Sequence, residues 1–225
     1  MRKLRALPRE FDILVVNDGS TDRTGVIADE LAHADRQRVY TVHLKHNCGI
    51  GVAVQTGYLF ASQNGGYKYV IQFDGDGQHD SESIGQLVVA CERDELDLCV
   101  GSRFMNGAGG GFQSTPLRRV GIRFFGLLLG CLTRVRVSDP TSGFRCAGPR
   151  AWRWFAESYP DDYPEPESLF WCLHNSMKVG EVPVEMQARR GGESSIDSLH
   201  SVYYMTKVTL AILCAWMRRR EPAIE

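Results

Sequence analysis

Apolar and polar positions follow one another along the first half of the chain in a repeated strand, turn and helix order. Short apolar runs rich in β-branched residues predict buried strands. We expect these strands at residues 11–16, 39–44, 70–73 and 96–100. Apolar residues at helical spacing predict helices at 22–34 and 81–92, and another that runs from the turn at 47–51 to residue 61. Ser20 or Thr21 is available to cap the first of these helices. Four strands alternating with helices indicate an α/β fold with a doubly wound, mostly parallel sheet flanked by helices.

The second half of the chain is less regular. Glycines gather between residues 104 and 115, which predicts a flexible segment and a candidate lid. An apolar helix with a basic start is expected at 116–133, and a compact polar turn at 138–145. Further elements are predicted as a helix at 165–179, a short strand at 181–184, a basic loop at 189–195 and a helix at 199–220.

The length of 225 residues suits one domain with a short appendage, and we divide the chain into residues 1–198 and 199–225. A net charge of −1 lacks the excess of positive charge that is typical of nucleic-acid-binding proteins. The seven cysteines are dispersed and contain no close pair that would grip zinc, which is typical of free thiols in a reducing cytosol.

Acidic residues stand on alternate positions directly after the strand at 70–73. Asp74, Asp76 and Gln78 should project to one side at the carboxyl end of this strand, where open parallel sheets bind ligands. Two carboxylates and an amide oxygen are hard ligands suited to Mg²⁺ or Mn²⁺, and such a cation would hold phosphate oxygens. The pattern predicts a metal-diphosphate site.

Other interpretations of these acidic residues are open. Aspartates at strand ends also act as turn formers and helix caps. A calcium loop needs glycine and glutamate where this chain has His79 and Gly85, so we exclude it. An aspartyl-nucleophile phosphatase begins with a similar strand and two alternate aspartates.

Several motifs, in order, resemble the inverting family 2 glycosyltransferases, and most closely the polyprenyl- and dolichyl-phosphate sugar synthases. The resemblance runs from Phe11 to about Ile196 and covers the segments 16–22, 47–57, 74–78, 101–103, 139–145 and 181–194. It implies the nucleotide-diphospho-sugar transferase fold, of glycosyltransferase A type, and makes the phosphatase interpretation a minor one.

The resemblance also assigns roles to individual residues. It implies a donor site made of Asp18, Gly19, Asn47, Gly49, Asp74, Arg189 and Ser194. Arg103 and Arg119 are implied to bind the acceptor phosphate, Asp76 and Asp139 to be catalytic, and Asp74, Asp76 and Gln78 to hold Mg²⁺ or Mn²⁺.

The implied reaction moves a sugar, with inversion, from a nucleotide-diphosphate sugar to an acceptor, which we expect to be a polyprenyl phosphate. A phosphate oxygen is already anionic, so Asp139 would then orient the acceptor; a hydroxyl acceptor would require Asp139 to take the proton. The alternative is a truncated, non-catalytic nucleotide-sugar-binding or partner protein.

The C-terminal helix at 199–220 carries an apolar stripe, listed as Val202, Met205, Val208, Ile212, Ala215 and Trp216, and ends in three arginines. This pattern predicts attachment at the cytoplasmic face of a membrane. A helix packed on the sheet, or on a second copy in a homodimer, is the alternative.

One part of the family pattern is missing. The family begins with a strand that carries a proline-tyrosine-asparagine-glutamate turn, and this sequence opens with what resembles the helix after it. We therefore expect a sheet that lacks the usual first strand, with an unpaired edge on the strand at 11–16, and an internal methionine of a longer reading frame at Met1.

Overall fold

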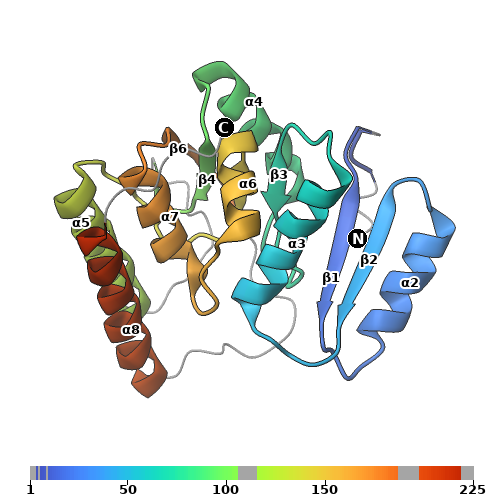
Figure 1. The fold of residues 1–225 in the computed structure, drawn as a ribbon, viewed down its shortest axis with the longest axis horizontal. Helices are drawn as coiled ribbons and strands as arrows, with labels where there is room; N and C mark the ends of the chain where they lie inside the picture. Colours follow the sequence, from blue (N-terminus) through green and yellow to red (C-terminus); the bar gives the residue numbers. More distant parts are fainter. Residues whose placement is uncertain (1–3, 5, 9, 106–115, 187–197, 219–225) are drawn as a thin grey trace.

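The computed structural model describes residues 4, 6–8, 10–105, 116–186 and 198–218 (Figure 1). Its strands are β1 (Ile13–Asp18), β2 (Val39–Leu44), β3 (Val70–Gln72), β4 (Leu98–Ser102), β5 (Arg145–Ala147) and β6 (Val179–Pro183). Its helices are α2 (Thr24–Ala34), α3 (Ile50–Asn64), the 3₁₀ turn η1 (Ser81–Ser83), α4 (Ile84–Asp94), α5 (Pro116–Thr133), α6 (Pro149–Glu157), α7 (Pro164–His174) and α8 (Ser198–Met217).

The strands form two ladders. β1 and β2 pair in parallel, and the second sheet has the order β3-β5-β4-β6. β4 and β6 are parallel, whereas β5 runs antiparallel to both β3 and β4. The prediction of a mostly parallel α/β sheet flanked by helices is confirmed, with β5 as the exception.

The two ladders do not pair with each other within the described residues. Within the described residues, β1 pairs only with β2, and β3 pairs only with β5. The edge of β1 that faces away from β2 therefore has no strand partner in this part of the chain, which agrees with the expected unpaired edge.

Alternating side chains of the four-stranded sheet supply two apolar cores, one on each face. Leu98 and Val100 of β4 belong to the larger core, together with side chains of α3, α5, α6, α7 and α8. Cys99, between them, belongs to the smaller core beneath α4. The sheet is thus covered on both sides, as an α/β fold requires.

The C-terminal helix α8 is part of the larger core. Val208, Ile212 and Ala215 are buried there, whereas Trp216 of the predicted stripe is half exposed, at 51%. The interpretation of this stripe as a membrane-facing surface was wrong for these three buried residues, because they pack inside the protein. The helix belongs to the same packed unit as the preceding residues, and residues 219–225 lie outside the described chain.

The start of α2 also differs from its prediction. The helix begins at Thr24, and neither Ser20 nor Thr21 caps it. The backbone N–H of Thr24 instead donates to Oδ1 of Asp22 at 2.9 Å. The N-cap position itself is Arg23, whose side chain makes no capping hydrogen bond.

Glycines on α3 give a stability prediction with an internal control. A Cβ on Gly51 would lie 2.1 Å from the backbone oxygen of Pro160, whereas a Cβ on Gly57 would meet nothing within 4 Å. Gly51→Ala should lower the free energy of unfolding by about 1–3 kcal/mol because backbone must move. Gly57→Ala should raise it by roughly 0.5–1 kcal/mol, since alanine favours a helix. Urea denaturation measures both, and equal effects would contradict the packing.

Candidate active site

The proposed donor side of the site lies at the carboxyl ends of β1 and β2. Asp18 ends β1, and its carboxylate accepts hydrogen bonds from the backbone N–H groups of Cys48 at 2.7 Å and Gly49 at 3.0 Å. The side-chain oxygen of Asn47 also accepts from Gly49, at 3.1 Å. Asp18, Asn47 and Gly49, which sequence motifs placed in one site, are therefore in direct contact.

Glycine is required at two of these positions. Gly19 has a φ of 62°, and a Cβ there would lie 2.3 Å from the backbone carbon of His46. Gly49 has a φ of 95° and precedes the first turn of α3. Positive φ values favour glycine, so these residues let the two strand ends meet beside the N-terminus of α3, a position that suits an anion.

The acidic side of the site follows β3. Asp74 is partly exposed, at 36% of its side chain, and its backbone N–H donates to Nδ1 of His79 at 3.1 Å. Asp76 accepts a hydrogen bond at Oδ1 from the backbone N–H of Gln78 at 2.9 Å. The residues predicted to hold a cation thus lie on one short loop whose shape is fixed by its own hydrogen bonds.

The buried side chain of His79 packs against this loop and accepts its hydrogen bond from Asp74. Its ring is stacked on Phe144 with the ring centroids 4.9 Å apart, and Nε2 lies 3.6 Å from Oδ2 of Asp74. Burial lowers the pKa of His79, although the carboxylates of Asp74 and Asp76 oppose this change. A neutral ring that accepts at Nδ1 carries its proton on Nε2, facing Asp74.

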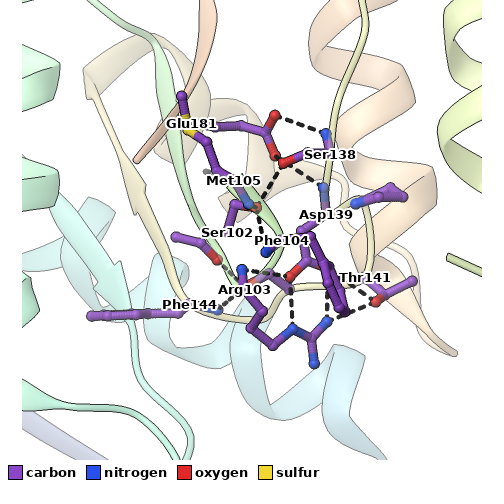
Figure 2. Close-up of polar contacts among 12 residues, drawn as sticks. Ser102, Arg103, Phe104, Met105, Ser138, Asp139, Thr141, Phe144 and Glu181 are labelled. Carbon is purple, nitrogen blue, oxygen red and sulfur yellow. Dashed lines mark hydrogen bonds and ion pairs between the residues drawn. The ribbon is translucent and has the colours of Figure 1, made fainter. Parts of the chain in front are cut away.

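Arg103 and Asp139 form a buried ion pair (Figure 2). Nε of Arg103 donates to Oδ2 of Asp139 at 2.6 Å, and Nη2 donates to Oδ1 at 2.7 Å. The side chain of Arg103 is 3% exposed and that of Asp139 is fully buried. The backbone N–H of Arg103 adds a further bond to the same carboxylate, at 3.1 Å. This geometry favours an orienting role for Asp139 over a proton-accepting role, because both of its oxygens already accept hydrogen bonds.

A second carboxylate holds the loop that carries Asp139. Oε1 of Glu181, on β6, accepts from the backbone N–H of Asp139 at 3.0 Å, and Oε2 accepts from that of Ser138 at 2.8 Å. The hydroxyl of Ser138 also meets that of Ser102, with the oxygens 2.6 Å apart. The end of β4, the loop and β6 are thereby locked together, as Figure 2 shows.

Arg145 is a structural residue that the sequence did not single out for a role. It is fully buried, and its guanidinium donates to the backbone oxygens of Ser142, Pro140 and Glu165 and to the hydroxyl of Ser168. It therefore ties the loop after Asp139 to the first turn of α7. The sequence signal that could have identified Arg145 is its position at the end of the polar, glycine-containing turn at 138–145.

The remaining predicted site residues are not part of this cluster in the described structure. Arg119 lies exposed near the start of α5. Arg189 and Ser194, predicted to contact the donor, lie outside the described residues, as do residues 106–115 of the candidate lid.

The donor set of the acidic loop fits a hard divalent cation that shares its coordination with phosphate. Within the described residues, no group of three or more His, Cys, Asp or Glu side chains is arranged to hold a metal. Asp74 and Asp76 are two carboxylates that both act on His79, and Gln78 adds an amide. Mg²⁺ is commonly held by one or two carboxylates together with substrate phosphates, which is what this loop offers.

Comparisons with known proteins agree with this fold. Residues 2–154 match the model of the family described as glycosyl transferase family 2. The chain is 33% identical over 207 residues to the polyprenol monophosphomannose synthase of Mycolicibacterium smegmatis, covering 88% of this chain and 75% of that protein. It is also 33% identical over 199 residues to the undecaprenyl-phosphate mannosyltransferase of Micrococcus luteus, covering 86% and 79%.

The fold is shared with a solved structure of glucosyl-3-phosphoglycerate synthase from Mycobacterium tuberculosis in complex with Mn²⁺, UDP and phosphoglyceric acid. The TM-score is 0.60 at 17% identity, and the match covers 92% of this chain and 68% of that one. The architecture is thus that of the nucleotide-diphospho-sugar transferases. The chain belongs to glycosyl transferase family 2.

Proposed function

We propose that this glycosyltransferase moves a sugar from a nucleotide-diphosphate sugar to a polyprenyl phosphate. The observation that carries the proposal is the closeness of the acidic loop to the Arg103–Asp139 pair: the charges of Asp74, Asp76 and Arg103 all act on His79. Relatives named for polyprenyl-phosphate acceptors support the choice of acceptor.

On the donor side, Asp18 holds the turn before α3 against the end of β1, next to the proposed nucleoside position. Asp74, Asp76 and Gln78 would hold Mg²⁺ or Mn²⁺, and the cation would neutralise charge that develops on the leaving diphosphate. Neighbouring folds solved with Mn²⁺ or Mg²⁺ and UDP support this assignment. Arg189 and Ser194 remain proposed donor contacts.

On the acceptor side, Asp139 fixes the plane of the Arg103 guanidinium, and Arg119 supplies positive charge near the start of α5. A phosphate acceptor needs orientation and charge neutralisation rather than deprotonation. A buried, hydrogen-bonded Asp139 suits that requirement better than it suits a hydroxyl acceptor.

We also propose that the end of the molecule formed by α5 and α8 contacts a membrane surface. The two helices lie side by side, away from α2 (Figure 1). Leu127 of α5 is 70% exposed and Leu210 of α8 is 57% exposed, and exposed arginines accompany them on α5. Within the described residues, no helix is long and apolar enough to cross a membrane.

Flotation with vesicles that contain anionic phosphatidylglycerol tests this contact. Leu127→Glu combined with Leu210→Glu should reduce vesicle binding, because charge is placed on the apolar surface. Val26→Glu changes another exposed apolar residue, 54% exposed, on α2 at the far end, and should leave binding intact. Identical flotation of both variants and the wild type would contradict the proposal.

A non-catalytic nucleotide-sugar-binding protein is the second candidate function. It is favoured by the edge of β1 beside Asp18, which has no strand partner among the described residues. Thermal-shift screening of UDP-glucose, GDP-mannose and UDP-N-acetylglucosamine, each with and without Mn²⁺, tests donor binding, which both candidates require. Metal-dependent stabilisation by at least one donor supports the site, whereas no shift with any donor would contradict both. Turnover, treated in the Discussion, separates the two.

A further inference from the structure

A carboxylate and an amide beside the centre of the site have no role in the chemistry described above. Glu165 is the second residue of α7, and Gln72 is the last residue of β3. Arg145 pairs with Gln72 in the sheet, and its Nη2 donates to the backbone oxygen of Glu165 at 2.7 Å. The same nitrogen donates to the backbone oxygen of Pro140 at 3.2 Å. Arg145 therefore brings the first turn of α7 close to both β3 and the loop of Asp139.

The Glu165 carboxylate lies within electrostatic reach of the reacting groups. Burial raises its pKa, the positive charges of Arg145 and Arg103 oppose this change, and the negative charge of Asp74 adds to it. The backbone N–H of Glu165 donates a hydrogen bond to its own carboxylate, and a carboxylate can accept several more. A largely buried acceptor in this state gains free energy when a ligand supplies a donor.

Gln72 presents the complementary group. Its side chain is buried, with the residue 8% exposed, and Nε2 has no hydrogen-bond partner in the described part of the chain. Its Oε1 faces the hydroxyl of Tyr159 at 3.5 Å, so the amide nitrogen points the other way. A buried amide donor without a partner is rare in proteins.

The space in front of this amide opens toward the acidic loop. A Cβ on Gly143 would lie 3.1 Å from Nε2 of Gln72 and 3.0 Å from Oδ2 of Asp74. Because Gly143 has no side chain, the Gln72 amide and the Asp74 carboxylate, a proposed metal ligand, both border the volume that a side chain would fill. The orphaned donor therefore faces the part of the site where the diphosphate end of a donor sugar would lie.

We propose that Gln72 and Glu165 bind hydroxyl groups of the sugar that is transferred, with Nε2 of Gln72 donating and the Glu165 carboxylate accepting. This proposal rests on the proposed function, and it adds the residues that select the sugar. Sugar hydroxyls both donate and accept hydrogen bonds, so an amide donor and a carboxylate acceptor that both lie close to Asp74 match them.

Glu165→Gln tests the proposal by calorimetry in the presence of Mn²⁺. UDP-glucose and GDP-mannose are compared with UDP and GDP, which lack the sugar. Affinity for the nucleotide sugar preferred by the wild type should fall by about 10- to 100-fold, the range for a lost hydrogen bond to a charged group. Affinity for the matching nucleoside diphosphate should not change. Gln72→Leu should show the same selective loss.

Glu167→Gln is the matched control. Glu167 lies in the same first turn of α7, and burial also raises its pKa, but its charge interacts with Lys207 and Arg218 instead of Asp74 and Arg103. Its replacement should leave both affinities unchanged. If Glu165 served only the helix terminus, the two glutamine variants would behave alike, which would overturn the proposal.

Two further outcomes are decisive. An equal loss of affinity for the nucleotide sugar and the nucleoside diphosphate in Glu165→Gln would place this residue at the diphosphate and overturn the sugar subsite. If Glu165→Gln and Gln72→Leu transfer sugar at the wild-type rate and bind the nucleotide sugar with wild-type affinity, this inference alone is overturned. Failure of the wild type to bind any nucleotide sugar would overturn it together with the proposed function.

Discussion

Replacing Asp76 with asparagine is expected to remove metal-dependent donor binding and to slow sugar transfer by about 100-fold or more, since charge stabilisation by a cation is worth several kcal/mol. An amide oxygen can still accept the hydrogen bond that the Asp76 carboxylate takes from the Gln78 backbone, so the loop should keep its shape. What is lost is the negative charge that balances the cation. Calorimetry with UDP-glucose and GDP-mannose, with and without Mn²⁺, measures the effect.

Asp94→Asn provides the control for this variant. Asp94 is an exposed carboxylate at the end of α4 that pairs with its neighbour Arg93, so its replacement should leave metal-dependent binding intact. Unchanged metal-dependent affinity in Asp76→Asn would remove Asp76 from the proposed metal site.

Removal of the Asp139 carboxylate should be the most destabilising change within the site. Asp139→Ala leaves the guanidinium of Arg103 buried without its charge partner, which costs about 3–5 kcal/mol of unfolding free energy. The double variant Arg103→Leu with Asp139→Leu should recover much of this loss, because no uncompensated charge then remains. Urea denaturation of the single and double variants measures the coupling between the two residues.

An exposed ion pair offers the comparison. Asp162 pairs with Lys207 on the surface, and Asp162→Ala should cost no more than about 1 kcal/mol. A similarly small loss in Asp139→Ala would show that the buried pair does not hold the site together, contrary to the structure.

Most regular elements of the fold followed from the apolar pattern. β2 and α5 have the predicted bounds, and β1, α3 and α8 differ by only a few residues. These segments are long enough for periodicity to decide their type. β5 was missed because it has three residues directly after a polar turn, and α6 was missed because its tryptophans and alanines do not form a distinctive run.

The site was predictable where a motif brings its members together locally. Asp74, Asp76 and Gln78 follow one strand, so their grouping required only the alternation of an extended chain. The pairing of Arg103 with Asp139 was not predictable, because 36 residues separate them and both were assigned separate roles. Glu165 and Gln72 lacked a signal altogether, since their position depends on the contacts of Arg145.

The predicted C-terminal stripe shows a different limit of sequence patterns. An apolar helical face next to arginines is compatible with a membrane and with a protein core. Val208 and Ile212 pack inside the protein, so the exposed apolar residues of α8 lie on another face of the helix. Periodicity identifies a buried face without identifying what buries it.

The measurement that tests the central claim most directly is sugar transfer to a lipid phosphate. Purified chain is incubated with Mn²⁺, undecaprenyl phosphate and radiolabelled UDP-glucose, GDP-mannose or UDP-N-acetylglucosamine, and the label that enters the organic phase is counted. We expect one donor to give a lipid-linked product that depends on Mn²⁺ and forms about 100-fold or more slowly with Asp76→Asn. Donor binding without any transfer, to this lipid or to water, would contradict the enzymatic account and favour the non-catalytic binder.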